Sequence, residues 1–143
     1  MTTPLRHVVY RSHAASGGIT DEMLDGIRAS AVRNNEELGI TGFLMCEGAS
    51  FLQLIEGPAD AIGQTFHRIQ GDRRHERIEV LLDASCDARS VPAWAMGVFF
   101  DDEGEAGDGA IAVIERALGH QTLHPDVRAV LETARDASGR NAA

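Results

Sequence analysis

The sequence predicts an α+β domain in which strands and helices follow one another as β-α-β-β-α-β-β. Three observations support this fold class. Short runs rich in β-branched and aromatic residues recur along the chain, two longer stretches repeat apolar residues at helical spacing, and glycine or proline punctuates the junctions. The 143 residues are enough for one domain with a substantial core and too few for two typical domains.

Periodicity predicts the first strand and the first helix. Residues 5–13 alternate as a strand, one face of which carries Val8, Tyr10 and Ser12. A helix then begins after Thr20, a suitable N-cap, and ends at Gly39. Its inner stripe recurs every three or four residues and consists of Leu24, Ile27, Ala31 and Asn34, with Asn35 beside them.

A hairpin and a second helix follow. Strands over residues 41–46 and 51–56 are joined by a turn at 47–50 that contains a glycine. Pro58 suits the first turn of the next helix, and Gly71 suits its end. The buried stripe of that helix consists of Ile62, Phe66 and Ile69.

Residues 77–83 and 93–100 are predicted as the fourth and fifth strands. The fifth is apolar on both faces, and alternation gives one face Trp94, Met96, Val98 and Phe100. Because helices on one side of the sheet would leave the other face in water, a further layer must cover it. Two amphipathic stretches can form that layer, with apolar residues Ile111, Ile114 and Leu118 in one and Val127, Val130, Leu131 and Ala134 in the other.

The expected architecture is therefore a ferredoxin-like plan with an added strand. A five-stranded sheet carries two helices on one face and two C-terminal helices on the other. We expect the sheet domain over residues 5–100, a helical cap over 101–136 and a flexible tail over 137–143.

Charge and composition exclude several classes of function. The formal net charge of -9 argues against direct binding to nucleic acid or to an anionic membrane, since both reward Lys and Arg. Cys46 and Cys86 stand far apart without metal-ligand spacing, which favours reduced thiols. No apolar run approaches the length of a membrane span, so we expect a cytoplasmic protein.

Gln53 is the least expected residue of the predicted sheet. Alternation places it on the face shared with Phe51 and Ile55, and an unpaired buried amide costs on the order of 1–3 kcal/mol. A polar partner is therefore expected, unless Gln53 is a half-exposed residue of an edge strand. The candidate partners are Tyr10, Ser12, Trp94, Asn34 and Asn35.

Other candidates for chemistry have plain structural alternatives. Tyr10 and Trp94 are the sole tyrosine and tryptophan, and both can take part in redox chemistry, although buried aromatics usually serve packing. Met96 is a packing residue by the same reasoning. The charged run from Asp72 to Arg77, which includes Arg74 and His75, suits either a solvated helix end or the rim of a ligand site.

Taken together, these segments resemble a BLUF domain, a blue-light sensor that uses flavin adenine dinucleotide (FAD). The resemblance rests on VVYRS around Tyr10, the asparagine pair before GITG, and then FLQLIEG, DRRH and WAMG, all in the family's order and approximate spacing. Each motif is weak alone, but five in register make a specific match over residues 5–100.

The resemblance implies roles for individual residues. Tyr10 would donate an electron and a proton to the excited flavin, and Gln53 would bridge Tyr10 to flavin N5 and O4. Trp94 and Met96 would form a switch beside Gln53. The remaining cofactor contacts implied are Ile27, Asn34, Asn35, Phe51, Asp72, Arg74 and His75, with Asn35 on the pyrimidine edge, Ile27 and Phe51 along the ring, and the last three around its dimethylbenzene and ribityl side.

The implied function is a light switch without turnover. The chain resembles a short stand-alone sensor, and we expect its signal to leave through the fifth strand and the C-terminal helices to a separate signalling protein, or through a homodimer or higher oligomer. Two alternatives stay open at this stage. One is a small flavin-dependent redox enzyme, although the chain lacks a nicotinamide-binding fingerprint; the other is a light-independent interaction module.

Overall fold

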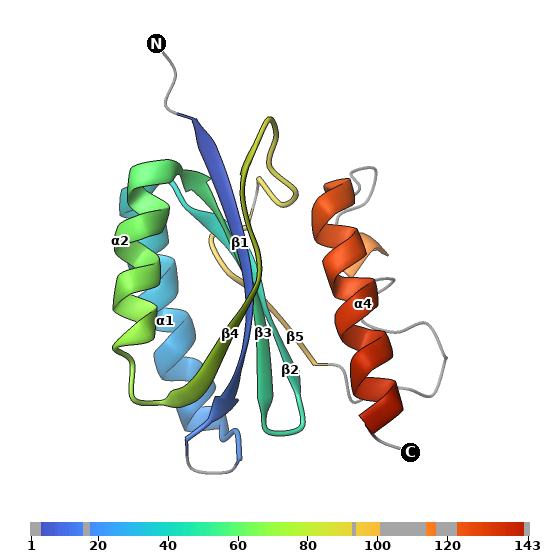
Figure 1. The fold of residues 1–143 in the computed structure, drawn as a ribbon. Coiled ribbons are helices and arrows are strands. Elements are labelled where there is room, and N and C mark those ends of the chain that lie inside the picture. Colours follow the sequence, from blue (N-terminus) through green and yellow to red (C-terminus); the bar gives the residue numbers. More distant parts are fainter. Residues whose placement is uncertain (1–3, 16–17, 93, 101–113, 117–122, 142–143) are drawn as a thin grey trace.

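A computed structural model describes residues 4–15, 18–92, 94–100, 114–116 and 123–141, and it has the predicted α+β arrangement (Figure 1). The elements follow the predicted order through the fifth strand and then enter a C-terminal helix. They are β1 (Leu5–Ala14), α1 (Asp21–Leu38), β2 (Thr41–Glu47), β3 (Ser50–Pro58), α2 (Ala59–Gln70), β4 (His75–Cys86), β5 (Gly97–Phe100) and α4 (Pro125–Asn141).

The five strands form one sheet in the order β4-β1-β3-β2-β5. The pairs β4–β1, β1–β3 and β3–β2 are antiparallel, whereas β2 and β5 are parallel. Strands β3 and β2 lie close together at Gly42, where an added Cβ would come within 2.0 Å of the Leu54 carbonyl oxygen. The close approach explains a glycine inside a central strand.

The ends of α1 are those that the sequence predicts. The Thr20 hydroxyl accepts a hydrogen bond from the Met23 N–H at 3.1 Å, and Gly39 closes the helix in the left-handed conformation with φ 71°. Pro58 differs from the prediction by one position. It ends β3 and occupies the N-cap position of α2, so the first helical turn begins at Ala59.

Helices cover both faces of the sheet. Figure 1 shows α1 and α2 together on one face and α4 on the other. Neighbouring strand residues therefore enter different cores: Val8 packs with Ile62 of α2, while Val9 packs with Val127 and Leu131 of α4. The predicted second helical layer is confirmed for α4.

The remaining predictions for the C-terminal segment divide into three groups. Ile114 lies in a helical turn and is fully buried in the α4-side core. Ile111, Leu118 and the side chain of Ala134 lie outside the described residues. Helix α4 continues to Asn141, through residues that we expected to form a frayed tail.

The fifth strand is shorter than predicted, and the predicted face for Trp94 and Met96 is wrong. Strand β5 begins at Gly97, so both residues precede it. Met96 packs in the cluster beneath α1, whereas Trp94 packs against the cluster that faces α4. The two residues take opposite sides because no sheet ladder imposes a period of two on the chain before Gly97.

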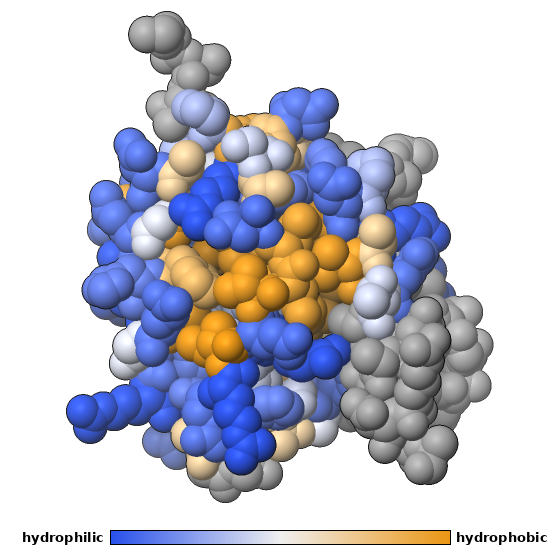
Figure 2. All heavy atoms as spheres, viewed as in Figure 1, coloured by the Kyte–Doolittle hydropathy of each residue, from blue (hydrophilic) through white to orange (hydrophobic). Residues whose placement is uncertain are grey.

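The outer surface has one apolar region on the side shown in Figure 2, over β4 at the edge of the sheet. Val80 in this strand is 47% exposed. Cys46 and Cys86 are free thiols, as predicted. Within the described part of the chain, no helix is both long and apolar enough to cross a membrane.

Candidate functional site

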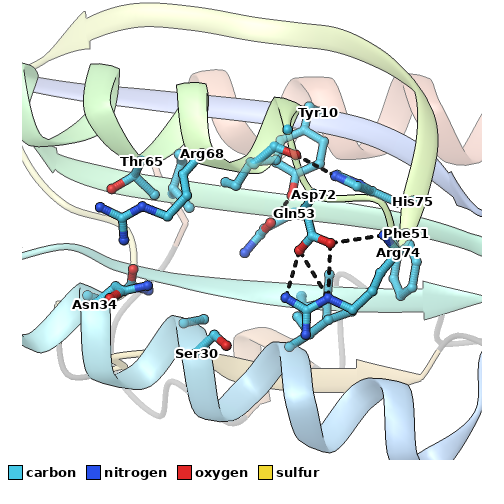
Figure 3. A pocket seen from close by; sticks show the side chains of 17 residues that line it. Tyr10, Ser30, Asn34, Phe51, Gln53, Thr65, Arg68, Asp72, Arg74 and His75 are labelled. Carbon is cyan, nitrogen blue, oxygen red and sulfur yellow. Dashed lines mark hydrogen bonds and ion pairs between the residues drawn. The ribbon is translucent and has the colours of Figure 1, made fainter.

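A cavity of about 370 Å³ lies between the sheet and the two helices α1 and α2 (Figure 3). All nine residues predicted to contact a cofactor line it, namely Tyr10, Ile27, Asn34, Asn35, Phe51, Gln53, Asp72, Arg74 and His75. These nine residues come from four elements and one turn, namely β1, α1, β3, the turn after α2, and β4, and they meet at one place. Its size is in the range of small-molecule sites.

The Gln53 amide has a hydrogen-bond partner at each end. Tyr10 and Gln53 stand directly opposite one another in the β1–β3 pairing. The Tyr10 hydroxyl donates a hydrogen bond to Gln53 Oε1, and Gln53 Nε2 donates to Met96 Sδ at 3.6 Å. Gln53 is 5% exposed in a central strand, so the alternative of a half-exposed edge residue is wrong.

Tyr10 is buried beneath α2. Its ring makes edge contacts with Phe66 and His75. Burial, followed by the nearby charge of Asp72, raises the pKa of the Tyr10 hydroxyl. The phenol therefore keeps its proton at neutral pH and acts as a hydrogen-bond donor to Gln53.

His75 forms the end wall of the cavity next to Tyr10. Its Nε2 lies 2.7 Å from the Ile69 carbonyl oxygen, and its Nδ1 lies 2.7 Å from the Ser12 hydroxyl. Because a carbonyl can only accept, Nε2 carries a proton. Ser12 is therefore occupied with His75 and is not the partner of Gln53.

Asn35 connects α1 with the segment before β5. It is 2% exposed, and its Nδ2 donates to the Ala95 carbonyl oxygen at 2.7 Å. Asn34 lines the cavity from the same helix and is partly exposed. Trp94 does not line the cavity; its carbonyl accepts from the Gly42 N–H at 3.0 Å. Met96 is therefore the member of this pair that contacts Gln53.

Glu56 anchors the other end of the segment that contains Trp94 and Met96. Its two carboxylate oxygens accept from the backbone N–H groups of Ser90 and Val91, each at 2.7 Å. Glu56 is fully buried, and burial raises its pKa against the opposing effect of these donors. The chain between β4 and β5 is thus held by directional polar contacts.

The rim of the cavity includes a tight turn after α2. Arg74 donates to both Asp72 oxygens, with Nη2 2.7 Å from Oδ2, and its backbone N–H donates to Oδ1 at 2.9 Å. Burial alone would raise the pKa of the Asp72 carboxyl, but the hydrogen bonds and charge of Arg74 outweigh it and hold that pKa below its ordinary value.

The family model for "Sensors of blue-light using FAD", the BLUF domain, matches residues 5–97. The chain belongs to the BLUF family. Residues 5–97 thus form a light-sensing domain, and FAD is its cofactor, as the sequence predicted. 

Several proteins whose names describe a response to light are similar to this chain. The photoactivated adenylate cyclase subunit beta of Euglena longa is 34% identical over 95 residues, which are 66% of this chain and 11% of that protein. The blue light- and temperature-regulated antirepressor BluF of Escherichia coli K12 is 29% identical over 126 residues, or 88% of this chain and 31% of that protein. The chain therefore spans a third or less of these relatives.

Solved BLUF structures share the fold over nearly the whole chain. The dark-state structure of the BLUF protein BlrB has a TM-score of 0.68 at 30% identity, covering 96% of this chain and 99% of that one. A structure of Klebsiella pneumoniae BlrP1 reaches a TM-score of 0.75 at 28% identity, covering 94% of this chain and 33% of that one.

The cavity suits the flavin of FAD. The buried Thr65 hydroxyl has no hydrogen-bond partner among the described residues, although it lines the cavity. Such a group is expected to meet a ligand or water. Apolar walls from Ile27, Phe51 and Ile55 alternate with the amides of Gln53 and Asn34, a lining that can hold a flat apolar ring with polar edges.

Sequence reasoning missed several lining residues. They are Ser30, Ala31, Leu44, Ile55, Thr65, Arg68, Ile69 and Gly71. Thr65 and Arg68 lie three residues apart beside the apolar stripe of α2, so helical spacing contains the signal that could have found them. In Figure 3, Arg68 and Asn34 point toward each other across the cavity.

We expect Asp72→Asn to destabilise the protein by up to about 1 kcal/mol near pH 6, as for other partly exposed ion pairs. Because the native pKa of Asp72 is depressed, its contribution is complete above its ordinary pKa of 3.8 and is lost as the pH falls through the native value. Urea unfolding of both proteins at pH 6 and near pH 3 measures this. In an Arg74→Gln background, Asp72→Asn should change the free energy of unfolding little. If the stability difference between the wild type and Asp72→Asn is as large near pH 3 as at pH 6, the ion pair with Arg74 is not its source.

Proposed function

We propose that Tyr10 and Gln53 form the light-responsive element of this BLUF sensor. The hydrogen-bonded series from Tyr10 through Gln53 to Met96 supports this proposal most directly, because all three side chains are buried and Tyr10 and Gln53 line the cavity. The other proposed contacts with FAD are Ile27, Asn34, Asn35, Phe51, Asp72, Arg74 and His75, which share the same cavity.

The side chains suit a proton-coupled switch. Bound FAD supplies absorption of blue light and an excited state that accepts an electron. Tyr10 is an oxidisable phenol, and its proton already points at Gln53 Oε1. The Gln53 amide has an acceptor end toward Tyr10 and a donor end toward Met96. Rotation or tautomerisation exchanges donor and acceptor and so changes what the cavity offers to the cofactor.

The amide is also weakly held at one end. A thioether sulfur is a poor acceptor compared with a carbonyl, and the Nε2–Sδ distance is 3.6 Å. A new orientation of Gln53 therefore gives up little at Met96. This weak contact makes Met96 the first residue outside the Tyr10–Gln53 pair to respond, whereas the role of Trp94 in the switch remains a prediction.

We further propose that the signal leaves through residues 90–97 toward α4. Met96 and Ala95 contact Gln53 and Asn35, respectively. At the other end of the segment, the Ser90 hydroxyl accepts from the His124 N–H at 2.9 Å, immediately before α4. The segment therefore contacts both the cavity side and the α4 side of the sheet.

The proposed output is altered binding to a separate protein or altered assembly of the chain with itself. The printed names of relatives include light-activated cyclases and an antirepressor, so light-dependent signalling occurs in proteins with related BLUF regions. Neither the partner nor a homo-oligomer follows from these names, and both remain part of the proposal.

Tyr10→Phe should retain FAD but lose the normal light-induced red shift in absorbance, because the hydroxyl that donates to Gln53 and the readily oxidised phenol are both removed. Absorption spectra before and after blue light measure this. Ser12→Ala is the matched control, since it removes a hydroxyl from the same strand face that bonds His75 instead. A normal photocycle in Tyr10→Phe would exclude Tyr10 as the donor.

Gln53→Leu should likewise give a yellow protein without the red shift, because leucine packs in the same place but cannot exchange donor and acceptor. Gln64→Leu, on the exposed side of α2, should behave like the wild type. The same spectra test the alternatives. Bleaching by NAD(P)H without a photocycle would favour a redox enzyme, and a colourless protein that cannot be reconstituted with FAD would favour an interaction module.

Hydrogen exchange tests the proposed route. Illumination should change protection in residues 90–97 and 123–131, because the contacts from Gln53 to Met96 and from Ser90 to His124 join them. Residues 62–69 of α2 serve as the internal reference. Identical exchange in dark and light over both segments, in protein with a normal photocycle, would rule out this route without affecting the Tyr10–Gln53 assignment.

A further inference from the structure

His7 is a polar residue in an apolar environment on the face of β1 opposite the cavity. It is fully buried, close to the core that contains Val9 and Leu54. Neither ring nitrogen has a hydrogen-bond partner among the described residues. Two unpaired polar atoms in a core carry a substantial desolvation cost. An aliphatic side chain would avoid this cost, so the presence of an imidazole here indicates that it binds a ligand.

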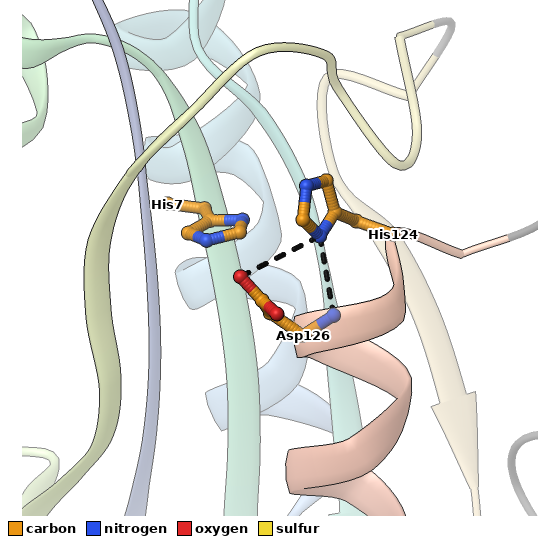
Figure 4. A group of neighbouring side chains, drawn as sticks. All are labelled: His7, His124 and Asp126. Atoms are coloured by element: carbon orange, nitrogen blue, oxygen red, sulfur yellow. Dashed lines mark hydrogen bonds and ion pairs between the residues drawn. The ribbon is translucent and has the colours of Figure 1, made fainter.

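The start of α4 brings two further metal-ligand side chains to His7. His124 directly precedes the helix, and Asp126 lies in its first turn. Figure 4 shows both near the His7 ring, and one ligand atom from each of the three residues lies within 4.8 Å of the others. The two imidazole rings are nearly perpendicular, with centroids 4.9 Å apart.

We propose that His7, His124 and Asp126 bind a divalent transition-metal ion of the zinc type. Two imidazoles and a carboxylate are a donor set that suits zinc and its first-row neighbours, whereas calcium and magnesium prefer oxygen ligands alone. Three protein ligands leave a fourth position for water. The net charge of -9 favours cation binding in general, and the buried, unpaired His7 gives this location its specificity.

The surroundings of His124 prepare one of its nitrogens as a ligand. Its Nε2 lies 3.4 Å from Asp87 Oδ1, a carboxylate that can hold the ring proton at that nitrogen. Nδ1 is then unprotonated: it accepts a hydrogen bond from the Asp126 N–H at 3.2 Å and lies 3.9 Å from Asp126 Oδ2. Metal binding at Nδ1 exchanges this hydrogen bond for a bond to the ion. A carboxylate that orients a ligating histidine is a common second-shell arrangement.

Metal binding requires a small inward movement. Ligand atoms bonded to one zinc ion lie at most about 4.2 Å apart, twice a bond of about 2.1 Å, whereas the widest separation here reaches 4.8 Å. Asp126 is 57% exposed and His124 directly precedes α4, so these two side chains can adjust toward His7 in the sheet. The bound ion would fasten the start of α4 to β1.

Zinc titration of the untagged full chain in the dark, after treatment with a chelator, tests the site independently of the light response. Calorimetry with zinc chloride should show one ion per chain with a micromolar or tighter dissociation constant. Asp126→Asn should weaken binding at least tenfold, and His7→Leu should abolish it. Zinc should also slow hydrogen exchange over residues 123–131 in the wild type and not in His7→Leu.

The variants are chosen so that they should fold normally. Asp126 is exposed, and His7→Leu removes two unpaired buried nitrogens, so the metal-free His7→Leu protein should be at least as stable as the wild type. His67→Leu, an exposed histidine of α2, and Cys86→Ser are controls that should bind zinc normally. The proposal is overturned if the wild type binds no zinc when zinc is in 100-fold excess over protein. It is also overturned if His7→Leu and Asp126→Asn bind zinc as tightly as the wild type.

Discussion

The antiparallel pairing of β1 with β3 is the constraint on which the rest of the molecule depends. It sets Tyr10 opposite Gln53 on the cavity face and His7 opposite Glu56 on the face toward α4. Because side chains alternate along a strand, a slip of one residue in this register would send each of these groups to the wrong side of the sheet. The hydrophobic residues between them, such as Val8 and Val9, hold the register by entering separate cores.

The segment between β4 and β5 is held in another way. A strand is fixed by a repeated ladder, but this segment is fixed by single contacts: Glu56 to Ser90 and Val91, Gly42 to Trp94, and Asn35 to Ala95. Each contact is directional and can be exchanged without unfolding its neighbours. A segment held in this way can have two arrangements that differ little in free energy, which a switch requires.

Sequence reasoning succeeded where a regular period determines the structure. Alternation in β1 and β3 predicted the shared face of Tyr10 and Gln53. Helical spacing predicted the inner stripe of α1, and the resemblance to the family, not the spacing, indicated which residues contact a cofactor. It failed at Trp94 and Met96, because a run of apolar letters does not reveal that the ladder begins only at Gly97. It also passed over His7, since a histidine in a strand reveals its missing partners only after the other chain segments are in place.

Gln53 and His7 show the same departure from a purely apolar core, on opposite faces of the β1–β3 pair. The amide has protein partners, whereas the imidazole lacks a hydrogen-bond partner among the described residues. Residues 90–96 join the two positions, because Met96 contacts Gln53 and Ser90 contacts the start of α4. If light alters the docking of α4, linkage requires that metal affinity changes with illumination, and that bound metal shifts the balance between the dark and light forms by the same free energy.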